Sequence, residues 1–151
     1  MKSNFIEILK KLQPVFLDTS CFIYTIENNP KYIGTTKLIL NAITDKQINA
    51  VTSVITVAEV LRKPFENNDL LLAQMYHSVF TQTKNLETVD LNVELSVNAS
   101  KISADYNFKL PDSYQLAVAK KYNCKTFLTN DKILKKFKGL EVMILDDLIS
   151  K

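Results

Sequence analysis

Glycine is almost absent from this sequence, and its scarcity excludes several classes of protein. Gly34 and Gly139 are the only glycines among 151 residues. A glycine-rich loop that brings backbone N–H groups close to phosphates cannot be built, so P-loop and dinucleotide-binding fingerprints are excluded. His77 is the only histidine. A histidine-rich zinc site is therefore excluded, and a Ser-His-Asp triad would depend on that one residue, for which we expect a structural role.

Paired cysteines and long apolar runs are also missing. Cys21 and Cys124 lie far apart without a CxxC motif, which predicts free thiols in a reducing compartment and neither a disulfide framework nor a zinc knuckle. No apolar run approaches the ~20 residues that span a bilayer, and residues 1–11 lack the uncharged centre of a signal peptide. We therefore expect a cytoplasmic protein without a membrane segment.

The composition is that of one ordinary globular domain. Hydrophobic residues make up 46% of the chain and charged residues 23%, and the mean hydropathy is −0.02. Disordered and coiled-coil proteins are excluded by this balance. The 19 Lys and Arg residues against 16 Asp and Glu residues give a net charge of +3, which permits an anionic partner without demanding one.

Short apolar runs alternate with helical patterns along the chain. We expect a buried strand at residues 15–17, because this apolar run follows Pro14 and is too short for a buried helix. Further strands are predicted at residues 48–52, 86–91, 126–128 and 142–145. Helices are predicted at residues 19–27, 31–44, 54–63 and 111–122, the third capped by Ser53 and ended with the help of Pro64. Helical spacing predicts two more core-facing helices, through Leu72, Met75, Tyr76 and Val79 and through Leu95, Ala99, Ile102 and Tyr106.

Strands that alternate with helices predict an α/β fold. The crossover connections imply a mostly parallel five-stranded sheet covered on both faces, in a three-layer α/β/α sandwich. Apolar residues at helical spacing also predict a short amphipathic helix over residues 3–13. We therefore divide the chain into an N-terminal helical extension, residues 1–14, and one domain, residues 15–151.

Two aspartates follow predicted strands. Asp18 comes directly after the first strand, and Asp131 comes three residues after Leu128 in the fourth. In an open parallel sheet, ligands bind beyond the carboxyl ends of the strands, near the point where the strand order reverses. If these two strands are neighbours, the two carboxylates converge.

Glu59 and Asp112 are the other candidate acids. Glu59 stands among apolar residues in a helix that we expect to be mostly packed, where an unpaired carboxylate is costly. Asp112 follows Pro111 at the start of a helix, so its side chain is expected to point toward the loop end. Capping, a helix-dipole contact or simple solvation would explain each acid alone. Together, carboxylates without a nearby histidine or thiol favour a Mg²⁺ or Mn²⁺ site suited to phosphodiester hydrolysis.

Four segments, in this order, resemble the PIN-domain ribonucleases, and within that family the VapC-type toxins of type II toxin–antitoxin systems. The segments are Val15–Ser20, Thr52–Leu61, Leu110–Ser113 and Phe127–Asp131. The resemblance implies a strand order of 3-2-1-4-5 and a catalytic pocket in which four acids bind Mg²⁺ or Mn²⁺ directly or through water: Asp18, Glu59, Asp112 and Asp131. It also implies an RNA substrate, frequent homodimerisation and an antitoxin protein that reaches into the pocket.

Other polar residues support or modify this prediction. Short side chains next to the acids are expected to hold the carboxylates or a water, with helix capping as the alternative: Thr19, Ser20, Ser113, Thr129 and Asn130. Ser103 stands where family members often carry an arginine, so contacts to phosphate or antitoxin are expected to differ. Lysines concentrate in the last third, where they could attract RNA phosphate or simply solvate helix faces: Lys120, Lys121, Lys125, Lys132, Lys135, Lys136 and Lys138.

Two other functions stay open at this stage. The first is a PIN-like module that binds RNA or a protein without cutting, although retention of all four acids counts against it. The second is a phosphohydrolase of the haloacid dehalogenase type, which also has an aspartate after its first strand. That chemistry requires a second aspartate two residues later, where this chain has Ser20. A metal-dependent endoribonuclease is therefore the preferred hypothesis.

Overall fold

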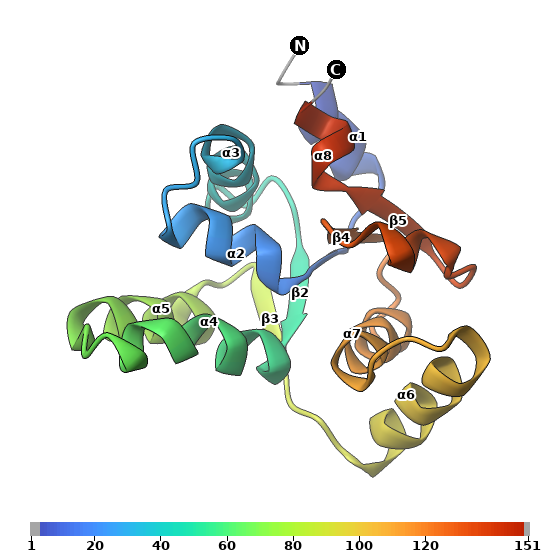
Figure 1. The fold of residues 1–151 in the computed structure, drawn as a ribbon. Helices are drawn as coiled ribbons and strands as arrows, with labels where there is room; N and C mark the ends of the chain where they lie inside the picture. The colour runs from blue at the N-terminus through green and yellow to red at the C-terminus, as the bar shows by residue number, and fades with distance from the viewer. Residues whose placement is uncertain (1–3, 150–151) are drawn as a thin grey trace.

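Five short strands form one parallel sheet at the centre of the chain (Figure 1). The computed structural model describes residues 4–149. Its strand order is β3-β2-β1-β4-β5, and every neighbouring pair is parallel. The α/β class and the strand order are thus confirmed. The strands are β1 (Val15–Leu17), β2 (Ala50–Ser53), β3 (Leu86–Val89), β4 (Thr126–Thr129) and β5 (Glu141–Ile144).

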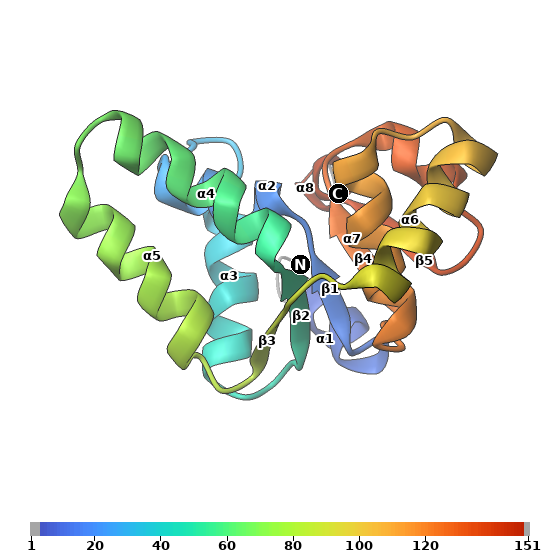
Figure 2. The same ribbon diagram turned by 90° about the horizontal axis from the view of Figure 1, so that it is seen from below.

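Helices cover both faces of this sheet. Figure 2 shows the α4–α5 pair and the α6–α7 pair on opposite sides of the strands. On the first side lie α1 (Asn4–Lys11), α2 (Thr19–Ile26), α3 (Ile33–Thr44), α4 (Val54–Glu66) and α5 (Leu70–Gln82). On the second side lie α6 (Val93–Tyr106) and α7 (Leu110–Lys121). Two short helices complete the described part of the chain, the 3-10 helix η1 (Lys132–Lys136) and α8 (Leu145–Ile149). The predicted three-layer sandwich is confirmed.

Alternate side chains of each strand divide the core into two layers. In β1, Val15 and Leu17 pack into the first layer and Phe16 into the second. In β4, Leu128 and Phe127 are divided in the same way, as expected from the two-residue period of a strand. The rings of Phe16 and Phe127 stack with centroids 4.9 Å apart. This pairing holds β1 and β4 together directly beneath the point where the strand order reverses.

The helix before the first strand is part of this packing. Phe5, Ile6 and Leu9 of α1 are buried in the first core layer. The following segment is tied to two strands, because the Thr126 hydroxyl donates to the Leu12 carbonyl and the Asn49 backbone N–H donates to the Gln13 side chain. The helix thus covers the core. Residues 1–3, 150 and 151, which belong to the predicted helix and domain ranges, lie outside the described residues.

Two local predictions were wrong. Pro64 does not end α4, which continues to Glu66. Proline lacks the N–H that would donate to the carbonyl four residues earlier, but its ring is buried here and the helical bonding resumes with the Asn67 N–H donating to the Lys63 carbonyl. Met75 was expected to face the core and is 57% exposed, because α5 is rotated so that Ala73 and Phe80 are its buried residues.

Two further expectations concern the state of the cysteines and the presence of a membrane-spanning helix. Cys21 and Cys124 are both free and buried, as predicted. Between residues 4 and 149, no helix has the length and apolar character needed to cross a bilayer.

Candidate active site

The four predicted acids line one cleft at the carboxyl ends of β1 and β4. Its volume is about 420 Å³. Since β1 and β4 are neighbours on either side of the reversal of strand order, the cleft lies where open α/β sheets bind their ligands. The structure therefore brings together side chains that are far apart in sequence. The lining residues are Asp18, Thr19, Ser20, Tyr24, Glu59, Asp112, Thr129, Asn130 and Asp131.

Among the four acids, Asp18 accepts the most hydrogen bonds from other residues of the cleft region. It directly follows β1 and caps α2, and its Oδ1 accepts the backbone N–H of Thr19 at 2.8 Å. Its Oδ2 accepts the Thr129 hydroxyl at 2.7 Å, which joins the ends of β1 and β4. Burial raises the pKa of Asp18, and the hydrogen bonds from Thr129 and Thr19 oppose that rise. Capping and a place in the cleft are thus combined in one residue.

Asp131 is held by the same threonine. Its backbone N–H donates to the Thr129 hydroxyl oxygen at 3.1 Å. Its own carboxylate caps η1 by accepting the Ile133 N–H at 3.1 Å. Thr129 therefore donates to one acid and positions the backbone of another, which is the supporting role expected for it.

Glu59 differs from its predicted surroundings. The helix was expected to be mostly packed around it, but Ala58 and Glu59 are both exposed, because α4 buries Thr56 and Val60 on its other side. The Glu59 carboxylate accepts the Thr19 hydroxyl at 3.1 Å. Partial burial raises its pKa, the Thr19 bond lowers it, and the charge of Asp18 raises it further. Glu59 thus forms the solvent-facing rim of the cleft.

The pKa of Asp112 is affected by the charges of the other three acids. Asp112 lies in the first turn of α7. Its pKa is raised to about 6, chiefly by burial and further by the charges of Asp18, Asp131 and Glu59, while Lys109 opposes the shift. Mutual repulsion of this kind is relieved when a cation binds among the carboxylates.

This repulsion predicts how the stability of the metal-free protein depends on pH. A raised folded-state pKa means that the folded protein binds protons more tightly than the unfolded chain, so stability falls as pH rises through that range. We expect Asp112→Asn to melt at a higher temperature than the wild type in EDTA at about pH 7. The difference should shrink as the pH falls and vanish below about pH 3, where the carboxyl is protonated in both the folded and the unfolded wild type.

Thermal melts in EDTA across this pH range measure the effect. Asp90→Asn is a matched control, because Asp90 is an exposed aspartate that does not line the cleft. An equal pH-dependent gain in both variants would contradict the assignment of the repulsion to the cleft.

Gln115 was missed in the sequence and lies beneath the cleft. It is only 1% exposed, one turn after Asp112 in α7. Its Nε2 donates to the Thr56 hydroxyl at 2.7 Å and more weakly to Asp18 Oδ1 at 3.4 Å, and its Oε1 accepts the Ser53 hydroxyl. It therefore connects α7 with α4 and with the end of β1. A glutamine inside the otherwise apolar run of a packed helix was the available signal, because a buried amide needs partners.

The other predicted supporting residues divide into two groups. Thr19, Ser20 and Asn130 line the cleft with the acids, but Ser113 does not. Ser113 is fully buried, and its hydroxyl donates to the Lys109 carbonyl. Ser103 is likewise outside the cleft and donates to the Phe108 carbonyl.

The lysines of the last third are exposed, and three of them form ion pairs. Lys121 pairs with Glu94 at 2.8 Å, and Lys135 with Asp147 at 3.0 Å. Lys132 lies 3.8 Å from Asp146. The exposed set is Lys120, Lys121, Lys125, Lys132, Lys135, Lys136 and Lys138.

The cleft fits a hard divalent cation by its chemistry. Its donors are carboxylates and hydroxyls, the oxygen ligands that Mg²⁺ and Mn²⁺ prefer. The Ser20 hydroxyl is buried at its wall without a hydrogen-bond partner within the described residues. Over residues 4–149, no group of three or more His, Cys, Asp or Glu side chains is gathered closely enough to hold an ion by itself. An ion that keeps several waters, as Mg²⁺ usually does, suits such a spacing.

Comparison with known proteins identifies the class. The family model of the PIN domain matches residues 15–140, and the chain therefore belongs to the PIN domain family. No curated protein sequence matched it.

Solved structures share the fold at low identity. A toxin–antitoxin complex from Klebsiella pneumoniae is 18% identical, with a TM-score of 0.66, over 87% of this chain and 97% of the other. DNA-bound VapBC from Salmonella typhimurium is 20% identical, with a TM-score of 0.61, over the same shares. The sarcin-ricin loop cleaving toxin VapC20 of Mycobacterium tuberculosis is 14% identical, with a TM-score of 0.62, over 75% of this chain and 86% of the other.

Proposed function

We propose that this protein is a metal-dependent endoribonuclease of the VapC type, acting in the cytoplasm as the toxin of a toxin–antitoxin pair. The observation that carries the proposal is the convergence of Asp18, Glu59, Asp112 and Asp131 in one cleft of a PIN domain. Further support comes from structures of similar fold that are described as a toxin–antitoxin complex and as a sarcin-ricin loop cleaving toxin. The charges of the other three acids help to raise the pKa of Asp112. Four carboxylates that repel one another in this way are costly to keep together unless a cation binds among them.

The acids divide the work of holding one or two ions of Mg²⁺ or Mn²⁺. Within the described residues, Asp18 accepts hydrogen bonds from Thr19, Thr129 and Gln115, more than any of the other three acids. Asp112 adds charge from α7, Asp131 from the loop after β4, and Glu59 from α4 at the rim. A bound divalent ion activates water and neutralises charge on the phosphodiester. Because no histidine lines the cleft among the described residues, the carboxylates are also the groups available to accept a proton from the attacking water.

The proposed partners are an RNA substrate, an antitoxin protein and a second copy of the chain, as the family resemblance implies. Exposed lysines after Asp131 on η1 provide positive charge for an RNA backbone. An antitoxin segment that reaches the carboxylates would inhibit the enzyme by supplying a competing cation or by covering the cleft. A homodimer is part of the same proposal, on the basis of family resemblance.

The proposal is tested by RNA cleavage with purified protein. We expect cleavage of RNA in Mg²⁺ or Mn²⁺, abolished by EDTA and restored by excess metal, with Asp112→Asn inactive and Asp90→Asn unchanged. Metal-independent cleavage, or full activity of Asp112→Asn, would reject the assigned site. Specific RNA binding without cleavage under any metal would instead identify a non-cutting PIN module.

A further inference from the structure

Asn130 lies between Thr129 and Asp131 in the sequence, but its side-chain amide forms hydrogen bonds with residues of other elements. Its Nδ2 donates to the Tyr24 hydroxyl at 3.0 Å, and its Oδ1 accepts the backbone N–H of Asp146 at 3.0 Å. An amide side chain provides a donor and an acceptor in one rigid plane, so these bonds fix it in two directions at once. The residues on either side of it are Thr129 and Asp131.

The two hydrogen-bond partners of Asn130, Tyr24 and Asp146, are also connected to each other through Tyr32. The rings of Tyr24 and Tyr32 stack with centroids 4.1 Å apart and an interplanar angle of 11°. The Tyr32 hydroxyl then donates to Asp146 Oδ1 at 2.5 Å. We name these four residues the Asn130 brace: Asn130, Tyr24, Tyr32 and Asp146. They come from the loop after β4, from α2, from the residue before α3 and from α8.

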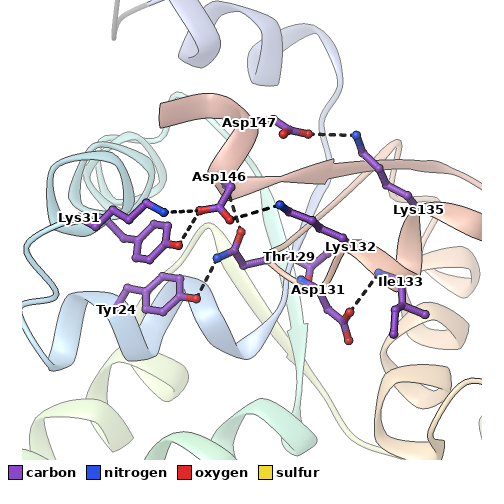
Figure 3. A network of polar contacts seen from close by, with 11 residues as sticks. Tyr24, Lys31, Thr129, Asp131, Lys132, Ile133, Lys135, Asp146 and Asp147 are labelled. Carbon is purple, nitrogen blue, oxygen red and sulfur yellow. Dashed lines mark hydrogen bonds and ion pairs between the residues drawn. The ribbon is translucent and has the colours of Figure 1, made fainter. Parts of the chain in front are cut away.

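The brace holds the chain on both sides of Asp131. Asn130 precedes that acid, and Lys132, which follows it, has its Nζ 3.8 Å from Asp146 Oδ2. Lys31 approaches the other oxygen of Asp146 at 3.3 Å. Figure 3 shows Asp146 between the two lysines, with Asp131 on the adjacent loop. Asp146 of α8 thus contacts the residue before Asp131 through its backbone N–H and the residue after it through its carboxylate.

We infer that the Asn130 brace positions Asp131 for metal binding, with Asn130, Tyr24, Tyr32 and Asp146 as positioning residues. The inference rests on the proposed function. Asp131 is exposed and lies on a short loop, where, within residues 4–149, its own hydrogen bonds reach only Thr129 and Ile133 of the same segment. Thr129 ties the backbone of Asp131 to Asp18, and the brace adds further contacts that fix the loop to α2 and α8. Outer residues of this kind typically control metal affinity because they orient the ligands.

The test compares the loss of one tyrosine hydroxyl inside and outside the brace. Tyr32→Phe removes the bond to Asp146 and keeps the ring stack. Tyr106→Phe is the matched control, because Tyr106 also stacks on an aromatic ring, that of Phe108, and its hydroxyl accepts the Lys138 N–H far from the cleft. Asn130→Ala removes both bonds of the amide. Should Asn130→Ala fail to fold, Tyr32→Phe, which lacks a single oxygen atom, carries the test alone.

Two measurements are made on each variant. Mn²⁺ binding, followed by electron paramagnetic resonance, is expected to weaken about tenfold in Tyr32→Phe and Asn130→Ala. In the metal-free protein, hydrogen exchange of the backbone amides of Asp131, Ile133 and Leu134 is expected to accelerate in both variants. Tyr106→Phe should match the wild type in both measurements.

The outcomes separate this inference from the proposed function. Wild-type Mn²⁺ affinity and wild-type amide exchange in Tyr32→Phe would overturn the brace, and so would an equal effect in Tyr106→Phe. If the wild type binds no Mn²⁺ and cuts no RNA, the proposed function fails. Amide exchange in the metal-free protein then decides about the brace alone: acceleration confined to the brace variants supports it, and unchanged exchange rejects it.

Discussion

Replacing Asp18 with asparagine is expected to reduce metal-dependent RNA cleavage by about a thousandfold, which corresponds to about 4 kcal/mol of transition-state stabilisation. Asp18 is the acid with the most hydrogen bonds from the protein, and asparagine keeps its shape while removing its charge. Burial disfavours that charge in the metal-free protein. The same substitution should therefore leave the melting temperature in EDTA equal to that of the wild type or raise it.

A loss of activity without a loss of thermal stability distinguishes a role of Asp18 in metal binding from a role in folding. Single-turnover cleavage of RNA in Mn²⁺ measures the first, and thermal melts in EDTA measure the second. Asp90→Asn has the same change of charge at an exposed site after β3 and should alter neither. A variant that loses activity because it unfolds, with a lowered melting temperature in EDTA, would contradict the assignment of Asp18 to metal binding.

Replacing Gln115 with leucine is expected to lower the free energy of unfolding by about 2–4 kcal/mol. The substitution leaves the buried hydroxyls of Ser53 and Thr56 without their amide partner, and each unsatisfied buried group costs about 1–3 kcal/mol. Apolar contacts of leucine offset only part of this cost. Because the amide also supports Asp18, we expect kcat to fall about tenfold in the folded fraction.

Urea denaturation monitored by circular dichroism measures the stability, and cleavage at low temperature measures kcat. Gln74→Leu is the matched control, because Gln74 is an exposed glutamine inside α5. Its free energy of unfolding should stay within about 0.5 kcal/mol of the wild type. If Gln115→Leu were as stable as Gln74→Leu, the polar network beneath the cleft would have no structural importance.

Local patterns in the sequence predict the strands and most helices of this fold. Val15–Leu17 is identified without error, since an apolar run of three residues after a proline has few alternatives. The end of α4 was not predicted, because the rule that proline stops a helix ignores the burial that Pro64 gains. The exposure of Met75 was not predicted either, since helical spacing gives a face but not the rotation that packing selects.

The sequence indicates the four acids and Thr129 as candidate residues, but it does not indicate Gln115 or the contacts that Asn130 makes. Asp18 and Asp131 stand at strand ends, a position that already indicates a ligand site. Gln115 and the Asn130 brace depend on contacts between segments far apart in the chain, such as Tyr32 with Asp146. No spacing rule links such pairs, because Tyr32 and Asp146 are 114 positions apart and meet only in the folded chain.

The central place of β1 in the sheet governs when the site can form during synthesis. β1 pairs with β2 on one side and with β4 on the other, although more than half of the chain separates it from β4. A nascent chain that has reached only β3 can pair one edge of β1, and Asp18 then has no Thr129 beside it. Closing so long a loop is slow compared with forming local contacts. Synthesis must therefore proceed through β4 before Asp18, Asp112 and Asp131 can line one cleft.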